Sequence, residues 1–430
     1  PSLGDVVDTL SGTGKTHLPR VIAAWLDRMD QRERWALLKL ITGGLRVGVS
    51  ARLAKTALGQ AFGLELGDIE EVWHGLEAPY TRLFDWAEGR ADRPDPSDQP
   101  VFRPFMLAHP LEDAVVDPAD YLVEWKWDGI RVQLVAMGGE VRLYSRTGDD
   151  ISAAFPDVVE GVPGNAGLLD GELLVRDAAG AVAPFNHLQQ RLNRKRVTKP
   201  LLRDYPAFVR VYDALFDGSR DLRALPIETR RARLSGLLER LPPDRFDQSE
   251  TLSADDWTAL EALRAGARTA GYEGLMLKRR GTPYQAGRQK GLWYKWKRDP
   301  LTADLVLMYA QRGHGKRSSY YSDFTFGAWG QRDGEGETPL LPVGKAYFGF
   351  TDEELRQLDR FVRDKTVQRF GPVREVEKSL VLEIAFDSLH RSPRHKSGVA
   401  MRFPRIKRIR WDKPADEAET LDRLATLAEG

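Results

Sequence analysis

Cysteine is absent from this chain of 430 residues. Its absence excludes disulfide bonds, thiolate zinc sites, iron–sulfur clusters and cysteine nucleophiles. No run of about 18 apolar residues occurs, so the sequence predicts no membrane-spanning helix. No basic segment followed by an apolar core marks a secretory signal either. We therefore expect no membrane partner and a cytoplasmic location.

An excess of charge of one sign is also lacking. The 64 Lys and Arg residues nearly balance the 63 Asp and Glu residues, which leaves a net charge of +1. Net charge therefore points to no partner, and only the distribution of charge along the chain can do so. With 42% apolar and 30% charged residues, the composition is that of an ordered globular protein, and its length allows roughly three domains.

The pattern of residues changes twice along the chain. Residues 1–88 have apolar positions at helical spacing, including a helix that starts after Ser50 as an N-cap. Residues 89–104 contain four prolines alternating with aspartates, which predicts a linker that packs no core. Residues 105–299 combine alternating strands with helices, and Gly138-Gly139 predicts a tight hairpin turn. Residues 300–430 are rich in strands, with one helix opened by a capping box at Thr351 and Glu354.

Two glycine-rich segments resemble phosphate-binding loops only weakly. The segment from Gly12 to Thr16 has Thr9 where a P-loop needs glycine, and no buried strand precedes it. The Gly313-His314-Gly315 segment has no βαβ context for dinucleotide binding. We interpret the first as a turn into a helix and the second as a basic surface loop.

The segment Glu124-Trp125-Lys126-Trp127-Asp128-Gly129-Ile130-Arg131 is the most informative. Strand alternation places Glu124 and Lys126 on one face, and the Asp-Gly turn brings Arg131 back on the next strand. A lysine beside an arginine has a lowered pKa, because a second cation disfavours the charged amine, and a neutral lysine is a nucleophile. Taken alone, the segment is equally well interpreted as a surface hairpin with ordinary charges.

Further charged segments follow, each unremarkable by itself. They are Arg146 after the next strand; Asp170 and Glu172, which alternation places on one face; Tyr212 near the end of a strand; Glu273 before an apolar strand that ends at Lys278; and Lys295 and Lys297, which share a face while Tyr294 and Trp296 pack behind. In this order they resemble the motifs of the covalent nucleotidyltransferases, and specifically the bacterial type of ATP-dependent DNA ligase. The segment 401–413 resembles the C-terminal signature of these ligases, and residues 44–49 resemble part of their helical DNA-binding domain.

The resemblance implies three regions of fold. These are an all-α N-terminal DNA-binding region (1–88), an α+β nucleotidyltransferase or adenylation domain with antiparallel sheets (105–299), and a C-terminal OB-fold β-barrel (300–430). The N-terminal region is shorter than in the large ligases, which leaves open an upstream truncation or a smaller clamp.

The resemblance also implies the chemistry and the residues that perform it. Lys126 would attack the α-phosphate of ATP and hold AMP, which then passes to the 5′-phosphate of nicked double-stranded DNA before the 3′-hydroxyl displaces it. Glu172 and Glu273 would hold Mg²⁺, with Mn²⁺ as a substitute. The nucleotide would be bound by Glu124 at the adenine end, Tyr212 stacked on the base, and the cations Arg131, Arg146, Arg288, Lys295, Lys297, Arg405, Arg410 and Lys413, together with Glu172. We expect a monomer that acts in DNA repair or replication.

Two clusters of basic residues agree with a DNA partner. Residues 278–298 contain eight basic residues and no acid, and residues 391–413 contain nine basic residues against Asp412 alone. A third basic stretch covers residues 191–196. Such density in a neutral chain is typical of surfaces that follow the phosphate backbone, although a merely solvated face remains an alternative.

Other members of the same superfamily are rival interpretations. An mRNA capping guanylyltransferase shares the first motif, and an RNA ligase is a second rival; the N-terminal helices and the segment 402–413 favour a DNA ligase over both. NAD-dependent ligases carry a four-cysteine zinc module, which this chain cannot form. A non-catalytic DNA-binding protein with a decayed site is disfavoured because the motif residues are intact.

Overall fold

The computed structural model describes residues 2–44, 48–96, 99–111, 116–192, 194, 197–254, 256–268, 271–313, 315, 318–331, 338–393 and 395–428. The chain divides into two compact units, residues 1–296 and residues 297–430, and each is described by itself. Within the described residues, no helix has both the length and the apolar character needed to cross a membrane.

The first unit begins with six helices. They are α1 (Leu3–Gly12), α2 (Leu18–Leu26), α3 (Gln31–Ile41), α4 (Ala51–Phe62), α5 (Leu66–Trp73) and α6 (Thr81–Ala87). Helices α1–α3 share a small apolar cluster around Val6, Trp25 and Leu37. The side chain of Ser50 caps α4 as predicted. The glycine-rich segment after Thr9 completes α1 and leads to α2 with no strand before it, which confirms that it is not a P-loop. Leu45, Arg46 and Val47 of the predicted DNA-binding segment lie outside the described residues.

The prediction that residues 89–104 pack no core is wrong. The segment has no helix or strand, but Pro94, Pro96, Phe102 and Arg103 are buried. Phe102 packs edge-on against His74 of the helical region and against Phe105. The proline-rich segment therefore lies against the helices and the sheet rather than spanning solvent, because its apolar rings find partners on both.

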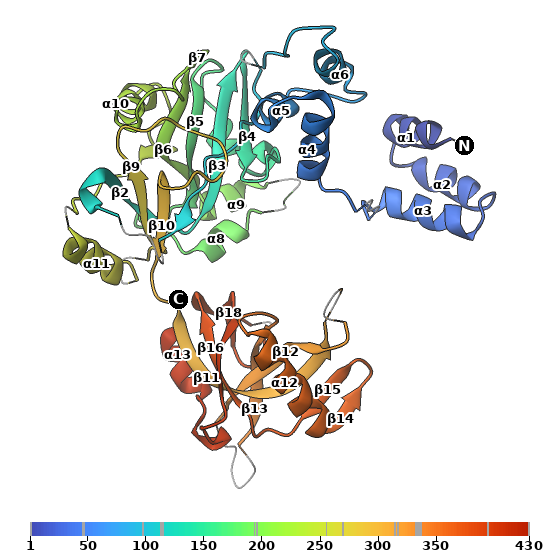
Figure 1. The fold of residues 1–430 in the computed structure, drawn as a ribbon, viewed down its shortest axis with the longest axis vertical. Coiled ribbons are helices and arrows are strands. Elements are labelled where there is room, and N and C mark those ends of the chain that lie inside the picture. Colours follow the sequence, from blue (N-terminus) through green and yellow to red (C-terminus); the bar gives the residue numbers. More distant parts are fainter. Residues whose placement is uncertain are drawn as a thin grey trace. The chain divides into compact units, whose positions relative to one another are not determined.

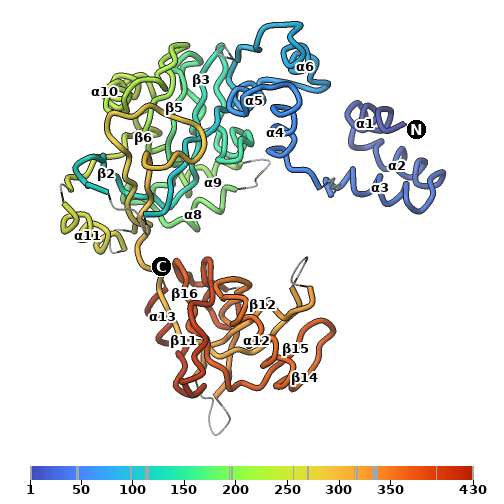
Figure 2. Tube along the Cα trace, in the orientation of Figure 1, coloured from blue at the N-terminus to red at the C-terminus, as the bar shows by residue number. Residues whose placement is uncertain are grey.

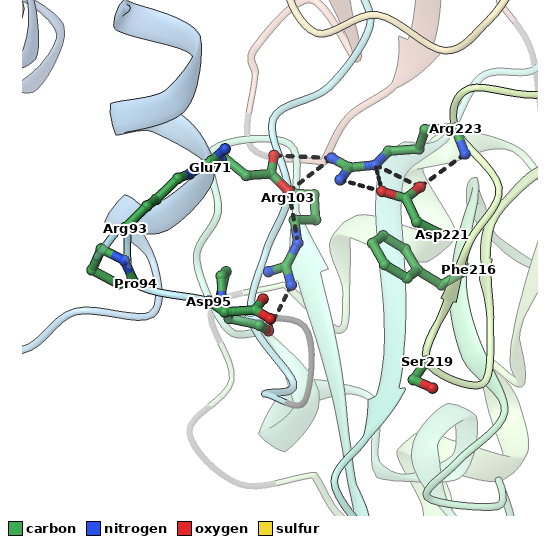
Figure 3. Close-up of a pocket in the computed structure, with 10 residues that line it drawn as sticks. Glu71, Arg93, Pro94, Asp95, Arg103, Phe216, Ser219, Asp221 and Arg223 are labelled. Carbon is green, nitrogen blue, oxygen red and sulfur yellow. Dashed lines mark hydrogen bonds and ion pairs between the residues drawn. The ribbon is translucent and has the colours of Figure 1, made fainter. Parts of the chain in front are cut away.

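Figure 3 shows the ion pairs that connect α5 to the sheet beside it. The Glu71 carboxylate of α5 forms ion pairs with Arg223 and Arg103, with N–O distances of 2.8 and 3.2 Å. Arg223 also pairs with Asp221 at 2.7 Å. These residues and Phe216 line a cavity of about 290 Å³. Because one carboxylate is shared by two arginines, of which Arg103 is fully buried, the junction of α5 with the following domain is held by charge as well as by packing.

The rest of the first unit contains two sheets and several helices. In chain order the elements are β1 (His109–Pro110), η1 (Pro118–Asp120), β2 (Tyr121–Lys126), β3 (Ile130–Met137), β4 (Glu140–Ser145), η2 (Ser152–Ala154), α7 (Pro156–Val159), β5 (Gly167–Val175), α8 (Phe185–Gln189), α9 (Lys199–Asp204), β6 (Ala207–Asp217), β7 (Arg220–Asp221), α10 (Ile227–Leu238), β8 (Phe246–Gln248), α11 (Trp257–Gly266), β9 (Gly274–Arg279) and β10 (Trp293–Lys297).

One sheet has the strand order β1-β10-β9-β2, and the other has β4-β3-β5-β6-β7 with β8 beside β6. The second sheet packs against α7, α8 and α10 through a core that includes Leu134, Leu173, Val211 and Leu234, and α10 runs alongside β6 (Figure 1). Gly138 and Gly139 both adopt positive φ in the β3–β4 turn, as the hairpin prediction requires. The chain passes from one sheet to the other in the short turn between β2 and β3, so the motif around Lys126 lies where the sheets meet.

The second unit is an OB-like β structure. Its elements are β11 (Leu301–Arg312), β12 (Tyr321–Trp329), β13 (Leu340–Ala346), α12 (Asp352–Asp364), β14 (Thr366–Phe370), β15 (Val373–Val376), β16 (Val381–Phe386), β17 (Ser388–Arg391), β18 (Val399–Arg402), β19 (Arg405–Arg410), η4 (Ala415–Glu417) and α13 (Leu421–Leu427). The long strand β11 pairs with β12, β15 and β16 in turn, and β16 pairs with β19. The predicted capping box of Thr351 and Glu354 opens α12.

Candidate active site

Lys126 occupies the last position of β2, directly opposite Gly274 of the antiparallel strand β9. This register places Glu273, the residue before β9, beside the lysine, and the backbone N–H of Glu273 donates to the carbonyl of Lys126 at 2.8 Å. The Lys126 Nζ donates to Glu273 Oε2. Both side chains remain partly accessible, with 22% and 16% of their surface exposed. The strand ends therefore present an amine and a carboxylate together at an open site.

A second carboxylate approaches the same amine from the other sheet. Glu172 lies on β5, and the turn at Gly129 presses against it so closely that a Cβ at Gly129 would lie 2.8 Å from the Glu172 side chain and 2.5 Å from the carbonyl of Leu173. Only glycine permits this approach. Burial raises the pKa of Glu172 to about 8, with nearby Glu273 adding to the shift and Lys126 opposing it.

The predicted lowering of the Lys126 pKa is wrong. Burial acts to lower it, but the carboxylates of Glu273 and Glu172 outweigh burial, so the pKa of Lys126 is raised. The prediction failed because it took Arg131 as the neighbour of the amine. The structure surrounds Lys126 with acids instead, and the amine must give up a proton before it can act as a nucleophile.

Arg131 has its own set of hydrogen-bond partners. It lies at the start of β3, and its guanidinium forms a two-point pair with Asp170 of β5 at 3.1 and 2.7 Å. Another Arg131 N–H donates to the carbonyl of Met106 at 2.7 Å. Tyr284, from the loop between β9 and β10 that is traced in Figure 2, donates to the same Asp170 at 2.7 Å. This network makes Arg131 a rigid cation in the floor of the site.

Two cations lie near the ring of Tyr212 of β6. The Lys278 Nζ lies 4.2 Å from the centre of the Tyr212 ring, and the guanidinium carbon of Arg131 lies 5.8 Å from it. Burial raises the pKa of Tyr212 well above its usual value. The residue is therefore a neutral aromatic surface in this site, as stacking on a base requires.

Glu124 lies on the same face of β2 as Lys126, two residues earlier, and is fully buried. Both of its carboxylate oxygens accept from Lys278 Nζ at 3.1 Å, and Oε1 also accepts from Arg231 of α10 at 2.6 Å. Burial lowers the pKa of Lys278, against the opposing effect of Glu124. Lys278 was predicted as part of a DNA-facing basic cluster, and its complete burial contradicts that assignment.

Two of the other predicted cations of the first unit lie at the surface. Arg146 is exposed in the turn after β4, and Arg288 is exposed in the loop before β10. Lys295 is half-buried on β10. The side chain of Tyr294 on the same strand packs into an apolar cluster, as the alternation predicts. Arg191 of the third basic stretch is buried and bound to Asp157 at 2.5 Å, so its assignment to a DNA-facing stretch is wrong; Asn193, Lys195 and Arg196 lie outside the described residues.

The remaining predicted cations form two groups in the second unit, each around one aspartate. The Asp387 carboxylate forms ion pairs with Lys297 and Arg405, with N–O distances of 3.3 and 3.1 Å. The Asp304 carboxylate forms ion pairs with Arg410 and Lys413, with N–O distances of 3.0 and 2.9 Å. Arg410 also pairs with Asp412 at 2.9 Å, so the two cations of the second group are matched by two aspartates.

The donor set fits a hard divalent cation only in part. The described residues contain no group of three or more acidic or histidine side chains suited to a metal. Mg²⁺ is commonly held by one or two carboxylates together with substrate phosphates rather than by a complete protein cage. The two carboxylates beside Lys126, Glu172 and Glu273, match that requirement.

Three functional candidates were not predicted as site residues. Asp170 and Tyr284 hold Arg131, and Arg231 holds Glu124. The alternation of β5 had placed Asp170 on the face of Glu172, but nothing in the sequence distinguishes Arg231 from the other arginines of α10. Arg231 is distinguished only by its burial and its contact with Glu124, and both are known only from the three-dimensional structure.

Comparison with protein families gives two matches. Residues 105–297 match the family described as "ATP dependent DNA ligase domain", and residues 317–413 match "ATP dependent DNA ligase C terminal region". The two matches cover both units, and the first contains Lys126, Glu172 and Glu273.

Individual proteins give the same picture. A "Probable DNA ligase" of Koribacter versatilis is 34% identical over 443 residues, covering 96% of this chain and 75% of that protein. "DNA ligase 1" of Korarchaeum cryptofilum is 33% identical, covering 94% of this chain and 73% of its own length. A solved structure from a study of Lig E DNA ligases has a TM-score of 0.51 at 21% identity, covering 72% of this chain and all of that one, and supports the fold.

Proposed function

The chain belongs to the family of ATP-dependent DNA ligases, and we propose that Lys126 is the lysine that carries AMP in its reaction. In the first step Nζ attacks the α-phosphorus of ATP; an N–P bond forms and the P–O bond to pyrophosphate breaks. A 5′-phosphate of nicked duplex DNA then takes the AMP from the lysine. Finally the 3′-hydroxyl attacks that phosphate, the strand is joined and AMP leaves.

The contact between Lys126 and Glu273 is the observation that supports this role. The raised pKa of Lys126 means that its side chain, before AMP is attached, is a protonated ammonium at neutral pH. Glu273 Oε2 already accepts a hydrogen bond from Nζ, so it is the nearest acceptor for the proton that must leave. Strand β2 holds the amine at the edge of the sheet, where a phosphate can approach it in line.

We assign Mg²⁺, with Mn²⁺ as a substitute, to Glu172 and Glu273. When bound, the metal neutralises charge on phosphate oxygens and lowers the barrier to phosphoryl transfer. The oxygens of Glu172 and Glu273 are hard donors of the kind that Mg²⁺ prefers. Burial is the main cause of the raised pKa of Glu172, with Glu273 adding to it, so a bound cation would displace the proton of Glu172.

The remaining residues are assigned to the nucleotide and the DNA. Tyr212 stacks on adenine, Glu124 lies at the adenine end, and Arg131 with Lys295 meets ribose and phosphate. Six further cations are assigned to contacts with phosphates: Arg146, Arg288, Lys297, Arg405, Arg410 and Lys413. We assign residues 1–88 to DNA binding, residues 105–299 to adenylation and residues 300–430 to an OB-fold domain, in an enzyme that acts as a monomer in repair or replication.

Incubation with α-labelled ATP or α-labelled GTP and Mg²⁺, followed by a denaturing gel, tests this function. We expect label from ATP that is stable to base, labile to acid and lost on addition of nicked DNA, with a joined strand as the product. Label from GTP alone would assign the chain to the capping class. No label from either nucleotide would contradict the proposal.

A further inference from the structure

The Glu124 carboxylate has its hydrogen-bonding capacity almost filled by protein. A carboxylate has about four acceptor positions. Three are taken, by Arg231 and Lys278 on Oε1 and by Lys278 on Oε2. One acceptor position therefore remains, on Oε2. Both oxygens already accept hydrogen bonds from cationic donors, so the group acts here as an acceptor.

Arg231 fixes the orientation of this carboxylate through three segments. Its Nη1 donates to Glu124 Oε1 at 2.6 Å and to the carbonyl of Tyr212 at 3.0 Å, while Nη2 donates to the carbonyl of Ser249 at 2.6 Å. The planar guanidinium therefore ties the carboxylate to the backbone of the residue proposed to stack on the base. Lys278 completes the arrangement, because its ammonium lies between Glu124 and the Tyr212 ring.

The site of AMP attachment lies on the same strand face. Two residues of extended strand separate Glu124 from Lys126, a distance of roughly 7 Å between their Cα atoms. A nucleotide whose phosphate meets Lys126 and whose base meets Tyr212 therefore directs one edge of the base toward Glu124. A buried acceptor with one open position suits an amine at that edge and is left unpaired, or repelled, by a carbonyl oxygen.

We propose that Arg231 and Lys278 are positioning residues that hold Glu124 as an acceptor for the exocyclic 6-amine of the purine, so that this pair determines the preference for a 6-amino over a 6-oxo or unsubstituted base. The inference rests on the proposed function, because it needs AMP to be the group transferred. It adds two residues to the recognition of the nucleotide, neither of which touches the reacting atoms.

Self-adenylation with three nucleotides tests the proposal: ATP, purine riboside triphosphate, which lacks a 6-substituent, and ITP, which carries a 6-oxo group. For the unmodified protein we expect kcat/KM to be roughly 10- to 100-fold higher for ATP than for purine riboside triphosphate, with ITP lower still. In Arg231→Lys the shorter, single-point donor releases the carboxylate. The rate with ATP should then fall toward that with purine riboside triphosphate, which should itself change little.

Arg230→Lys is the matched control. Arg230 is the neighbouring residue of α10, is as deeply buried, and forms a two-point pair with Asp213 at 2.8 Å and 2.8 Å without touching Glu124. It should keep the ratio between the nucleotides whatever its effect on the overall rate. A merely structural role for Arg231 would lower all three rates by one factor, and that result would overturn the proposal.

Two further results keep the test decisive. If Arg231→Lys does not fold, Lys278→Met gives the same comparison, and a ratio near one in the unmodified protein overturns the inference in any case. If ATP labels the protein but its kcat/KM equals that of purine riboside triphosphate, this inference is contradicted and the proposed function is not. Absence of all label would contradict the proposed function and, with it, the inference.

Discussion

Two lysine–carboxylate pairs lie on the same two strands, and they differ in almost every physical respect. In one, the lysine is on β2 and the acid precedes β9 (Lys126 and Glu273); in the other, the acid is on β2 and the lysine is on β9 (Glu124 and Lys278). The first pair has side chains 22% and 16% exposed, and the second has side chains 1% and 2% exposed.

The surrounding charges explain the different outcomes. Two carboxylates, Glu273 and Glu172, face the single amine of Lys126, and its pKa is raised. Two cations, Lys278 and Arg231, face the single carboxylate of Glu124, and burial lowers the pKa of Lys278. An excess of acid leaves a site for a metal and a proton acceptor, whereas an excess of base leaves a fixed acceptor. We therefore propose that one strand pair carries a reactive end and a recognition end.

The largest expected difference between the pairs is in chemistry. Lys126→Ala should abolish AMP attachment, a loss of at least about 10³-fold, because no other group provides the nucleophile. Labelled ATP on a denaturing gel measures it, and DNA binding by gel shift should be unchanged. The exposed residue Lys199 provides the control, since Lys199→Ala should keep full attachment. Persistent attachment in Lys126→Ala would refute the assignment.

The second prediction concerns the acid of the reactive pair. Glu273→Gln removes the nearest proton acceptor and one of the two proposed metal ligands, so the rate of adenylation should fall roughly 10²-fold. The Mg²⁺ concentration needed for half the maximal rate should rise at the same time. A titration of Mg²⁺ at saturating ATP measures both quantities, and an unchanged requirement for Mg²⁺ would remove Glu273 from the metal site.

Stability should show the reverse order of importance. Lys278→Met breaks a fully buried pair and should reduce the free energy of unfolding by about 2–4 kcal/mol, because Glu124 loses one of its two cations. Lys126→Met, at the partly open pair, should change it by about 1 kcal/mol or less. Denaturant unfolding of the two variants compares them directly. Equal losses would show that burial does not distinguish the pairs.

The smallest expected effect is on the pH dependence of stability. The pKa of Glu172 is about 8 in the folded chain, above its usual value, so the folded state binds more protons than the unfolded state between about pH 4.5 and pH 8. Stability should therefore fall as the pH rises through that range. Glu172→Gln should remove this dependence and be more stable than the unmodified protein at pH 8, with the two converging near pH 5.

Unfolding at several pH values, with EDTA present to remove metal, measures this effect. If the difference between Glu172→Gln and the unmodified protein does not change with pH, then the Glu172 carboxyl does not carry the raised pKa.

The sequence allowed some of these features to be predicted and not others. Alternation was sufficient to place Glu124 and Lys126 on one face, because the period of a strand needs no knowledge of its neighbours. The pairing of Arg131 with Asp170 instead of a place beside Lys126 depends on the register between β3 and β5, which single-strand patterns do not contain. Arg231 acts on Glu124 across 107 positions of sequence.

The misplaced surface assignments have a similar origin. Lys278 and Arg191 stand in basic stretches, and a count of charges treats every lysine or arginine as exposed. Both are buried because each finds a carboxylate in another element, Glu124 and Asp157 respectively. Charge density along the sequence indicates a nucleic-acid surface only for residues that lack such partners.

The central claim is that the two pairs have separate roles, and mapping the attached AMP tests it most directly. The protein is labelled with ATP, digested and analysed by mass spectrometry under conditions that preserve the phosphoramidate. We predict AMP on the peptide that contains Lys126 and none on the peptide that contains Lys278. AMP on Lys278, or on any lysine other than Lys126, would contradict the account.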